Sequence, residues 1–140
     1  MTLREITPDD VDLLRLWASQ DHATAKALGP DVLTTMPICY AVVNGSEAPV
    51  GFVGGQRIGP FLNGQIVIDP EKRKGWLFNK LCQLGEQKAR DEGVRVIVAL
   101  PQFFNGPSRA MLRWRKYLPI PVVMFHPTEE VKTMLMGKVL

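Results

Sequence analysis

A strand-like run at Val94–Leu100, placed just after an amphipathic helix, constrains the fold of this chain more than any other feature. Its β-branched and largely apolar residues are typical of a strand that is covered on both faces. The preceding helix carries an apolar stripe that includes Leu77 and Leu81, and Gly93 is expected to end it. Because another strand-like segment, Gln65–Ile68, precedes the helix, we predict a right-handed crossover that joins two parallel strands.

The N-terminal region predicts a short strand followed by a helix. Leu3–Ile6 has the character of a strand, and Thr7–Asp10 has the composition of a helix start. It offers a threonine oxygen as cap, a proline in the first turn and two acids at the positive end of the helix dipole. A second short helix is expected at 21–28, where Gly29–Pro30 would stop it.

The middle of the chain predicts an antiparallel meander. Ile38–Val43 and Pro49–Ile58 have strand character, and Asn44–Gly45 between them is a hairpin signal. Asn63–Gly64 repeats that signal, so we expect a second turn there, leading into the strand Gln65–Ile68.

The C-terminal part predicts one more helix and one or two strands. Ser108–Tyr117 has helical periodicity, and Trp114 is expected in the core because it shares a stripe with Met111 and Leu118. Ile120–Phe125 is expected as a strand that starts at a sheet edge or a bend, because Pro119 and Pro121 cannot donate ladder hydrogen bonds. Residues 131–139 fit either a strand or a short helix.

The predicted fold class is therefore α+β. We expect a mixed, mostly antiparallel sheet with a central parallel pair, in a single domain that covers residues 1–140. The length of 140 residues suits one domain with a real core, and 46% hydrophobic against 22% charged residues excludes a disordered chain.

Cysteine and apolar patterning argue against several other classes of protein. Cys39 and Cys82 lie far apart and lack metal-ligand spacing, so we expect reduced thiols, no zinc site and no other metal. No apolar run approaches the roughly 20 residues that a membrane span needs. The first five residues, with an acid among them, do not resemble a signal peptide, and a cytoplasmic location is expected.

The charges are unevenly distributed along the chain. Met1–Leu62 holds four basic and seven acidic residues, whereas Val94–Thr128 holds five basic residues and no acid. Such a basic stretch suits a face for an anionic ligand or for a partner, or it is simply a solvated face. The candidate partner-binding residues are Arg109, Arg113, Arg115 and Lys116.

Four segments, in this order, resemble the GNAT (Gcn5-related N-acetyltransferase) superfamily across nearly the whole chain. Residues 3–10 look like the family's opening strand and helix cap, and residues 48–55 look like its third strand. Residues 68–75 are similar to the start of its acyl-CoA motif, and residues 105–108 to the Asn-x-x-Ser that opens the helix after the fifth strand. The resemblance implies helices on both faces of the sheet and a splay between the fourth and fifth strands.

The resemblance also implies a place for acetyl-CoA. In the family, a basic, glycine-containing loop at a helix N-terminus surrounds the CoA pyrophosphate with backbone N–H groups. The matching residues here are Arg73, Lys74 and Gly75, with Asn105 and Ser108 on the later helix. The match stops at residues 76–78, where Trp, Leu and Phe stand in place of a second small residue.

The positions that carry the family's chemistry are altered. The fourth strand often holds a glutamate as general base, whereas Asn63–Ile68 contains no carboxylate and presents Gln65. The tyrosine that acts as an acid in many members, seven residues after the asparagine, is replaced by Leu112. Tyr117 is the remaining candidate for a catalytic acid.

Three functions follow from these observations. The first is a GNAT-fold protein that has lost acetyl transfer and works as a binding or structural module with a protein partner, for example inside a phage particle. The second is an active acetyl-CoA-dependent N-acyltransferase, and without activity no cofactor is expected. The third is a nucleic-acid-binding protein that uses the basic helix, although no recognised DNA-binding motif is present.

Overall fold

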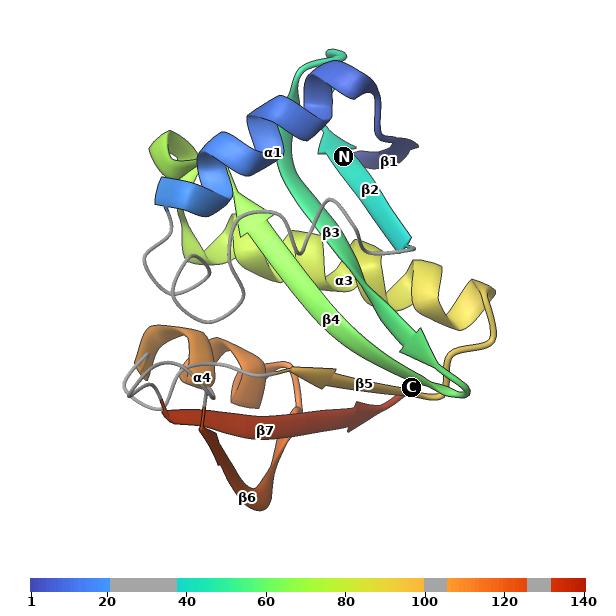
Figure 1. Cartoon of the computed structure of the whole chain (residues 1–140), viewed down its shortest axis with the longest axis vertical. Helices are drawn as coiled ribbons and strands as arrows, with labels where there is room; N and C mark the ends of the chain where they lie inside the picture. Colours follow the sequence, from blue (N-terminus) through green and yellow to red (C-terminus); the bar gives the residue numbers. More distant parts are fainter. Residues whose placement is uncertain (21–37, 100–105, 126–131) are drawn as a thin grey trace.

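The computed structural model describes residues 1–20, 38–99, 106–125 and 132–140. Within these ranges, seven strands form one mixed sheet in the order β1-β2-β3-β4-β5-β7-β6, with helices on both faces (Figure 1). The predicted helix at 21–28, together with Asn105, lies outside the described residues. The elements are β1 Thr2–Glu5, α1 Pro8–Gln20, β2 Ile38–Val43, β3 Pro49–Ile58, β4 Phe61–Ile68, the 3-10 turn η1 Pro70–Lys72, α3 Gly75–Asp91, β5 Val96–Ala99, α4 Gly106–Trp114, β6 Leu118–Phe125 and β7 Lys132–Val139.

The start of α1 confirms the predicted cap. The Asp10 backbone N–H donates to Thr7 Oγ1 at 3.4 Å, and the Thr7 N–H donates to Asp10 Oδ2 at 2.7 Å. This reciprocal pair is a capping box, which satisfies two N–H groups at the start of the helix. Arg4, from β1, adds a bidentate ion pair with Asp10 at 2.5 and 3.0 Å.

The meander is confirmed, but the predicted turn at Asn63–Gly64 is wrong. The chain turns at Gly59–Pro60, where Gly59 adopts a φ of 58°, and β4 begins at Phe61. Gly64 lies inside the strand opposite Gly55. A Cβ on Gly64 would lie 3.2 Å from Ile97 Cγ2, so this glycine permits close packing of a neighbouring side chain.

The strand–helix–strand unit is confirmed. α3 ends near Gly93, which has a φ of 79°, and β5 returns parallel to β4. The two strands pair only where Phe61–Asn63 faces Val96–Val98. Beyond Asn63 they diverge, and this divergence is the predicted splay (Figure 1).

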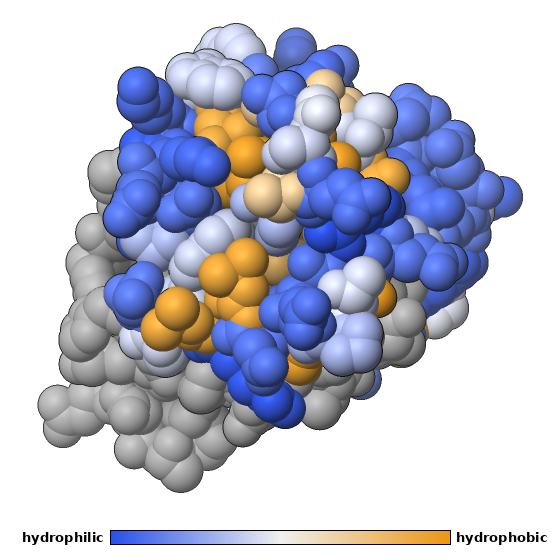
Figure 2. Space-filling model, turned by 90° about the horizontal axis from the view of Figure 1, so that it is seen from above, coloured by the Kyte–Doolittle hydropathy of each residue, from blue (hydrophilic) through white to orange (hydrophobic). Residues whose placement is uncertain are grey.

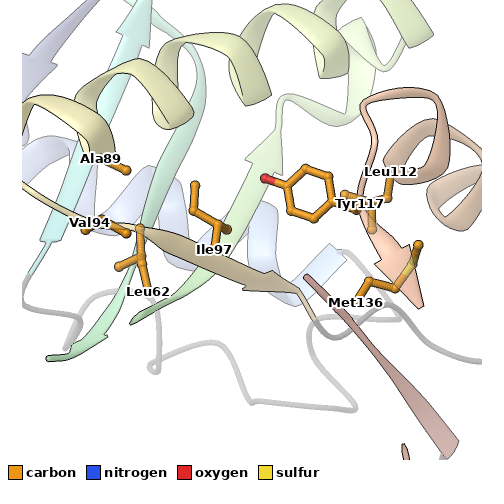
Figure 3. Packing of buried hydrophobic residues seen from close by; sticks show 7 residues of the cluster. All are labelled: Leu62, Ala89, Val94, Ile97, Leu112, Tyr117 and Met136. Atoms are coloured by element: carbon orange, nitrogen blue, oxygen red, sulfur yellow. The ribbon is translucent and has the colours of Figure 1, made fainter. Parts of the chain in front are cut away.

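Alternate residues of the central strands pack against helices on opposite faces. On one face, Leu14 and Trp17 of α1 pack with Phe52 and Val67. On the other, the apolar stripe of α3 covers residues of β2 and β3, including Val53. A third cluster joins α3, β4, β5, the α4–β6 corner and β7; its members are Leu62, Ala89, Val94, Ile97, Leu112, Tyr117 and Met136 (Figure 3).

The C-terminal strands complete one side of the sheet. Lys132–Val139 is a strand, β7, which decides between the two alternatives for this segment. β6 lies at the sheet edge, and its pairing with β7 is irregular between Pro119 and Val123, as its prolines predict. The expectation that Trp114 lies in the core is wrong: 67% of this residue is exposed, and Leu112 is the buried residue of α4.

The surface seen from above in Figure 1 is mainly hydrophilic, and its hydrophobic residues form small, separate patches (Figure 2). No helix in the described ranges combines the length and the apolar character needed to cross a membrane.

Candidate functional site

The loop between β4 and α3 is stabilised by hydrogen bonds and an ion pair among its own residues. Asp69 Oδ1 accepts the Glu71 N–H at 3.0 Å, and its backbone oxygen accepts the Lys72 N–H at 2.9 Å. Lys72 Nζ lies 3.5 Å from the second carboxylate oxygen of Asp69. These contacts close the 3-10 turn η1 and set the direction in which the chain enters α3.

The first N–H groups of α3 lack the side-chain capping hydrogen bonds that α1 has. Lys74 is the N-cap residue and makes no side-chain capping hydrogen bond, and no acid lies in the first turn. The first helical hydrogen bonds run from the N–H groups of Leu77 and Phe78 to the Lys74 oxygen, at 3.0 and 3.1 Å. The N–H groups of Gly75 and Trp76 precede these bonds, and with the basic loop they form a positive helix end.

Gly75, at this helix end, is exposed although bulky residues follow it. Trp76 is 60% exposed, whereas Leu77 is buried. Gly75 itself is exposed, and an added Cβ there would meet only Met111 Sδ, at 3.9 Å. Arg73, Lys74 and Gly75 therefore lie together at the surface.

The splay brings two neutral amide side chains into the centre of the sheet. Asn63 and Gln65 are alternate residues of β4, so they share one face, where Asn63 lies opposite Val98 at the last parallel pair. Both side chains are partly buried, and Asn63 Oδ1 is buried without a hydrogen-bond partner among the described residues. Neither amide can take up a proton at neutral pH.

A buried ion network lies between α3, the end of α4 and β7. Glu86 is 2% exposed, and its carboxylate accepts from Arg115 Nε at 3.1 Å and Arg115 Nη2 at 2.7 Å. Lys138 Nζ donates to Glu86 Oε2 at 2.8 Å, and Arg115 Nη1 donates to Asn79 Oδ1 at 2.6 Å. Burial alone would raise the pKa of Glu86, but the hydrogen bonds from the two cations lower it overall.

Tyr117, the candidate acid, belongs to the core beside this network. It is 4% exposed, and its hydroxyl points away from α4 toward the side where Ile97 lies (Figure 3). Burial, with the Glu86 charge and hydrogen bond, raises the pKa of Tyr117 far above its ordinary value. Lys138 Nζ lies 5.7 Å from the centre of its ring. The hydroxyl is therefore held in its neutral form next to a carboxylate.

Burial keeps both thiols in their protonated form. Burial raises the pKa of Cys82 to about 12 and that of Cys39 to about 11, so neither is a thiolate at neutral pH. Cys82 is a small buried residue of α3. Across the described ranges, no group of three or more His, Cys, Asp or Glu side chains could hold a metal ion.

The four basic residues predicted to bind a partner do not all lie at the surface. Arg113 and Lys116 are exposed, and Lys116 adopts a φ of 69° where the chain leaves α4. Arg115 points inward to Glu86, and Arg109 is partly buried. Ser108 lies in the first turn of α4. The surface at the end of α4 thus carries two of the four predicted cations.

Sequence reasoning missed Glu86, Lys138 and Asn79. One signal was present: Glu86 falls on the inward stripe of α3 that also includes Cys82 and Ala89. A charge on such a stripe indicates a buried partner. Nothing in the sequence, however, pairs Glu86 with a residue 52 positions away.

Neither family models nor curated proteins match the sequence. Among solved structures, the chain resembles a ribosomal-protein-alanine N-acetyltransferase from Brucella melitensis (16% identity, TM-score 0.74), with 100% of both chains covered. It also resembles mutant forms of the spermidine/spermine N-acetyltransferase SpeG from Vibrio cholerae (12% identity, TM-score 0.79, 99% of this chain and 92% of that chain). An aminoglycoside acetyltransferase in complex with coenzyme A matches at 17% identity and a TM-score of 0.72, over 99% of this chain and 94% of that one.

These similarities, at 17% identity or less, show the fold of the chain. The chain has the fold of the GNAT N-acetyltransferases, as the four sequence segments predicted.

Proposed function

We propose that this protein is a GNAT-fold binding module that has lost acetyl-transfer chemistry and acts through a protein partner. A component of an assembly, such as a phage particle, is one concrete form of this function. The observation that carries the proposal is that Tyr117 is buried in the core with its hydroxyl next to the carboxylate of Glu86.

The support for lost catalysis comes from the groups that acetyl transfer needs. An amine acceptor must lose a proton, and the departing CoA thiolate is assisted by an acid. β4 presents Asn63 and Gln65, which cannot accept a proton, and Leu112 is packed in the core where the family has tyrosine. Tyr117 cannot serve because its hydroxyl is buried beside a carboxylate. No described residue in the splay therefore fills either role.

The end of α4 supports a protein partner. Trp114 and Leu118 are 67% and 70% exposed, and Arg113 and Lys116 lie next to them in the chain. Exposed tryptophan with arginine is the composition of an interface centre. Because residues 94–128 contain no acid, the partner is expected to present an acidic surface.

The experiment is an assay of CoA thiol release from acetyl-CoA. The protein is mixed with acetyl-CoA and a panel of polyamine, aminoglycoside and N-terminal alanine peptide acceptors. We expect no release above spontaneous hydrolysis, and the same result for Tyr117→Phe. Release that exceeds hydrolysis and is lost in Tyr117→Phe would show an active transferase and overturn the proposal.

A second candidate is an acyl-CoA-dependent transferase, favoured by the exposed, uncapped and basic start of α3. Arg73, Lys74 and Gly75 would hold the pyrophosphate of acyl-CoA there, and bound acyl-CoA would supply a reactive thioester. Calorimetry with CoA tests this candidate, with Gly75→Trp as the blocking variant and Lys80→Ser as the control. The candidate requires micromolar binding that Gly75→Trp abolishes, and it fails if no binding is detected at millimolar CoA.

A further inference from the structure

The first turns of α3 lie beside α4, and the two segments run in the same direction. A Cβ on Gly75 would lie 3.9 Å from Met111 Sδ, and Asn79 Oδ1 accepts from Arg115 Nη1 at 2.6 Å. The second contact lies four residues beyond the first on both segments, which is about one helical turn. Leu112 of α4 joins the core cluster that also includes residues of α3. The two helices therefore form one layer of the molecule.

This helical layer is strongly basic. Residues 72–90 hold six basic side chains and residues 106–118 hold four, against the single acid Glu86. Glu86 is buried and paired with Arg115 and Lys138, so it does not neutralise the exposed cations. Two of the lysines pair with acids just outside these segments. By contrast, α1 on the opposite face of the sheet holds three acids and one base. Positive charge is thus concentrated on the α3–α4 side.

Two exposed tryptophans lie on the outer side of the same layer. Trp76 follows Gly75 by one residue, and Trp114 precedes Arg115 by one. A helix rotates by about 100° per residue, so on parallel neighbours a step forward from one contact and a step back from the other turn both rings to the same side. Trp76 is 60% exposed and Trp114 67%, so that side faces solvent.

The composition of this outer side favours a nucleic acid over a protein surface. Lys80 lies one turn after Trp76, and Arg113 and Lys116 are exposed on either side of the Trp114–Arg115 step. Within the described parts of α3 and α4, the large exposed hydrophobic residues are the two tryptophans, without aliphatic neighbours. Cations contact phosphates, and indole rings stack on bases, which is the combination that binds single strands.

We propose that the outer face of α3 and α4 binds single-stranded nucleic acid. The two indole rings stack on unpaired bases, and three cations contact the phosphates. The residues of this nucleic-acid face are Trp76, Lys80, Arg113, Trp114 and Lys116. A double helix fits less well, because its bases are already stacked on one another.

The inference goes beyond the proposed function, because it gives the protein a second class of ligand. Trp114 belongs both to the nucleic-acid face and to the proposed protein contact at the end of α4. Trp76 belongs to the nucleic-acid face alone, and Leu118, which is 70% exposed at the start of β6, belongs to the protein contact alone. Variants of these two residues therefore separate the two surfaces.

The test is a titration of the full-length protein with oligothymidylate and with oligouridylate, each about 16 nucleotides long. Calorimetry measures the affinity, and tryptophan fluorescence reports stacking, since the third tryptophan, Trp17, is buried. We expect quenching on binding. With three phosphate contacts on a single strand, the affinity should fall roughly 20-fold as the salt concentration rises from about 50 to about 200 mM. The preferred oligonucleotide shows whether DNA or RNA is bound.

Variants of exposed residues test the face without disturbing the core. Trp76→Ala should weaken binding about tenfold, which corresponds to about 1.4 kcal/mol, whereas Trp76→Phe should keep most of the affinity because phenylalanine also stacks. Arg113→Ser should reduce the steepness of the salt dependence by about one contact. The matched controls are Leu118→Ser and Arg15→Ser on α1, which should leave the affinity and its salt dependence unchanged.

No binding at low salt, a flat salt response or unchanged affinity in Trp76→Ala would overturn the proposal. Equal or tighter binding of a duplex of the same length would also overturn it. Polyglutamate that displaces the oligonucleotide at equal concentration would assign the face to an acidic protein instead. The thiol-release assay is independent of all these readouts, so the loss of catalysis and the binding of nucleic acid can fail separately.

Discussion

Asp10 and Glu86 are the two buried carboxylates among the described residues, and each is held by an arginine through two hydrogen bonds. Asp10 draws its partners from nearby in sequence: Thr7 lies three residues away and Arg4 six. Glu86 draws its cations from 29 and 52 residues away. The first pair finishes the start of one helix, whereas the second ties α3 to the α4–β6 corner and to β7.

The largest effect is expected from Glu86→Ala. Removing the buried carboxylate leaves Arg115 and Lys138 as partly buried cations without this anion, and breaking a buried pair costs about 3–5 kcal/mol. Urea denaturation should show this loss in the free energy of unfolding. Glu71→Ala, at an exposed position, serves as control and should change it by less than about 0.5 kcal/mol. A loss below about 1 kcal/mol for Glu86→Ala would mean that the network does not join the three elements.

Asp10→Ala should have a smaller effect. It removes the hydrogen bond from the Thr7 N–H, keeps the one from the residue-10 N–H to Thr7 Oγ1, and leaves Arg4, which retains a hydrogen bond to the Glu47 oxygen at 2.6 Å. Loss of a capping contact typically costs about 0.5–2 kcal/mol. The same denaturation experiment measures it, and exposed Asp12→Ala on the same helix is the control. An effect as large as that of Glu86→Ala would remove the distinction between the local and the long-range pair.

Acid should weaken the contribution of Asp10 to the free energy of unfolding over a defined range of pH. Hydrogen bonds from Arg4 and Thr7 lower the pKa of Asp10 to about 2, whereas its value in an unfolded chain is about 3.9. The stabilisation is therefore complete above about pH 5 and is lost as the pH falls toward 2. The difference in unfolding free energy between the wild type and Asp10→Asn should shrink as the pH falls from 5 to 2.5. A constant difference over that range would contradict the assignment.

The smallest effect is expected from Lys138→Met. The network has two cations for one carboxylate, so the remaining Arg115 pair is balanced in charge. A methionine can replace the lysine stem beside the Tyr117 ring, and we expect a change within about 1 kcal/mol. A loss near that of Glu86→Ala would show that Lys138, and not Arg115, is the main partner of Glu86.

Short-range sequence patterns predicted most of the helices and strands, but not the contacts between distant segments that bury Tyr117 and Glu86. The capping box at Thr7–Asp10, the left-handed Gly93 and the edge position of the proline-containing β6 all depend on a few neighbouring residues. The prediction of a turn at Asn63–Gly64 was wrong. These residues carry a local hairpin signal, but they pair with β3 inside a strand, and Ile97 packs closely against Gly64. The prediction that Trp114 lies in the core was wrong, because helical periodicity identifies a stripe of residues but not the side of the helix that meets the sheet.

The sequence by itself determined the GNAT-like order of elements, the crossover and the capped start of α1, because periodicity and capping act over a few residues. Only the tertiary structure decided that Tyr117 faces Glu86 and that, among the described residues, Asn63 Oδ1 has no partner and β4 pairs only with β3 beyond Asn63. These features depend on contacts between segments far apart in the chain. Their energies come from burial and from ion pairing across elements, which local residue patterns do not encode.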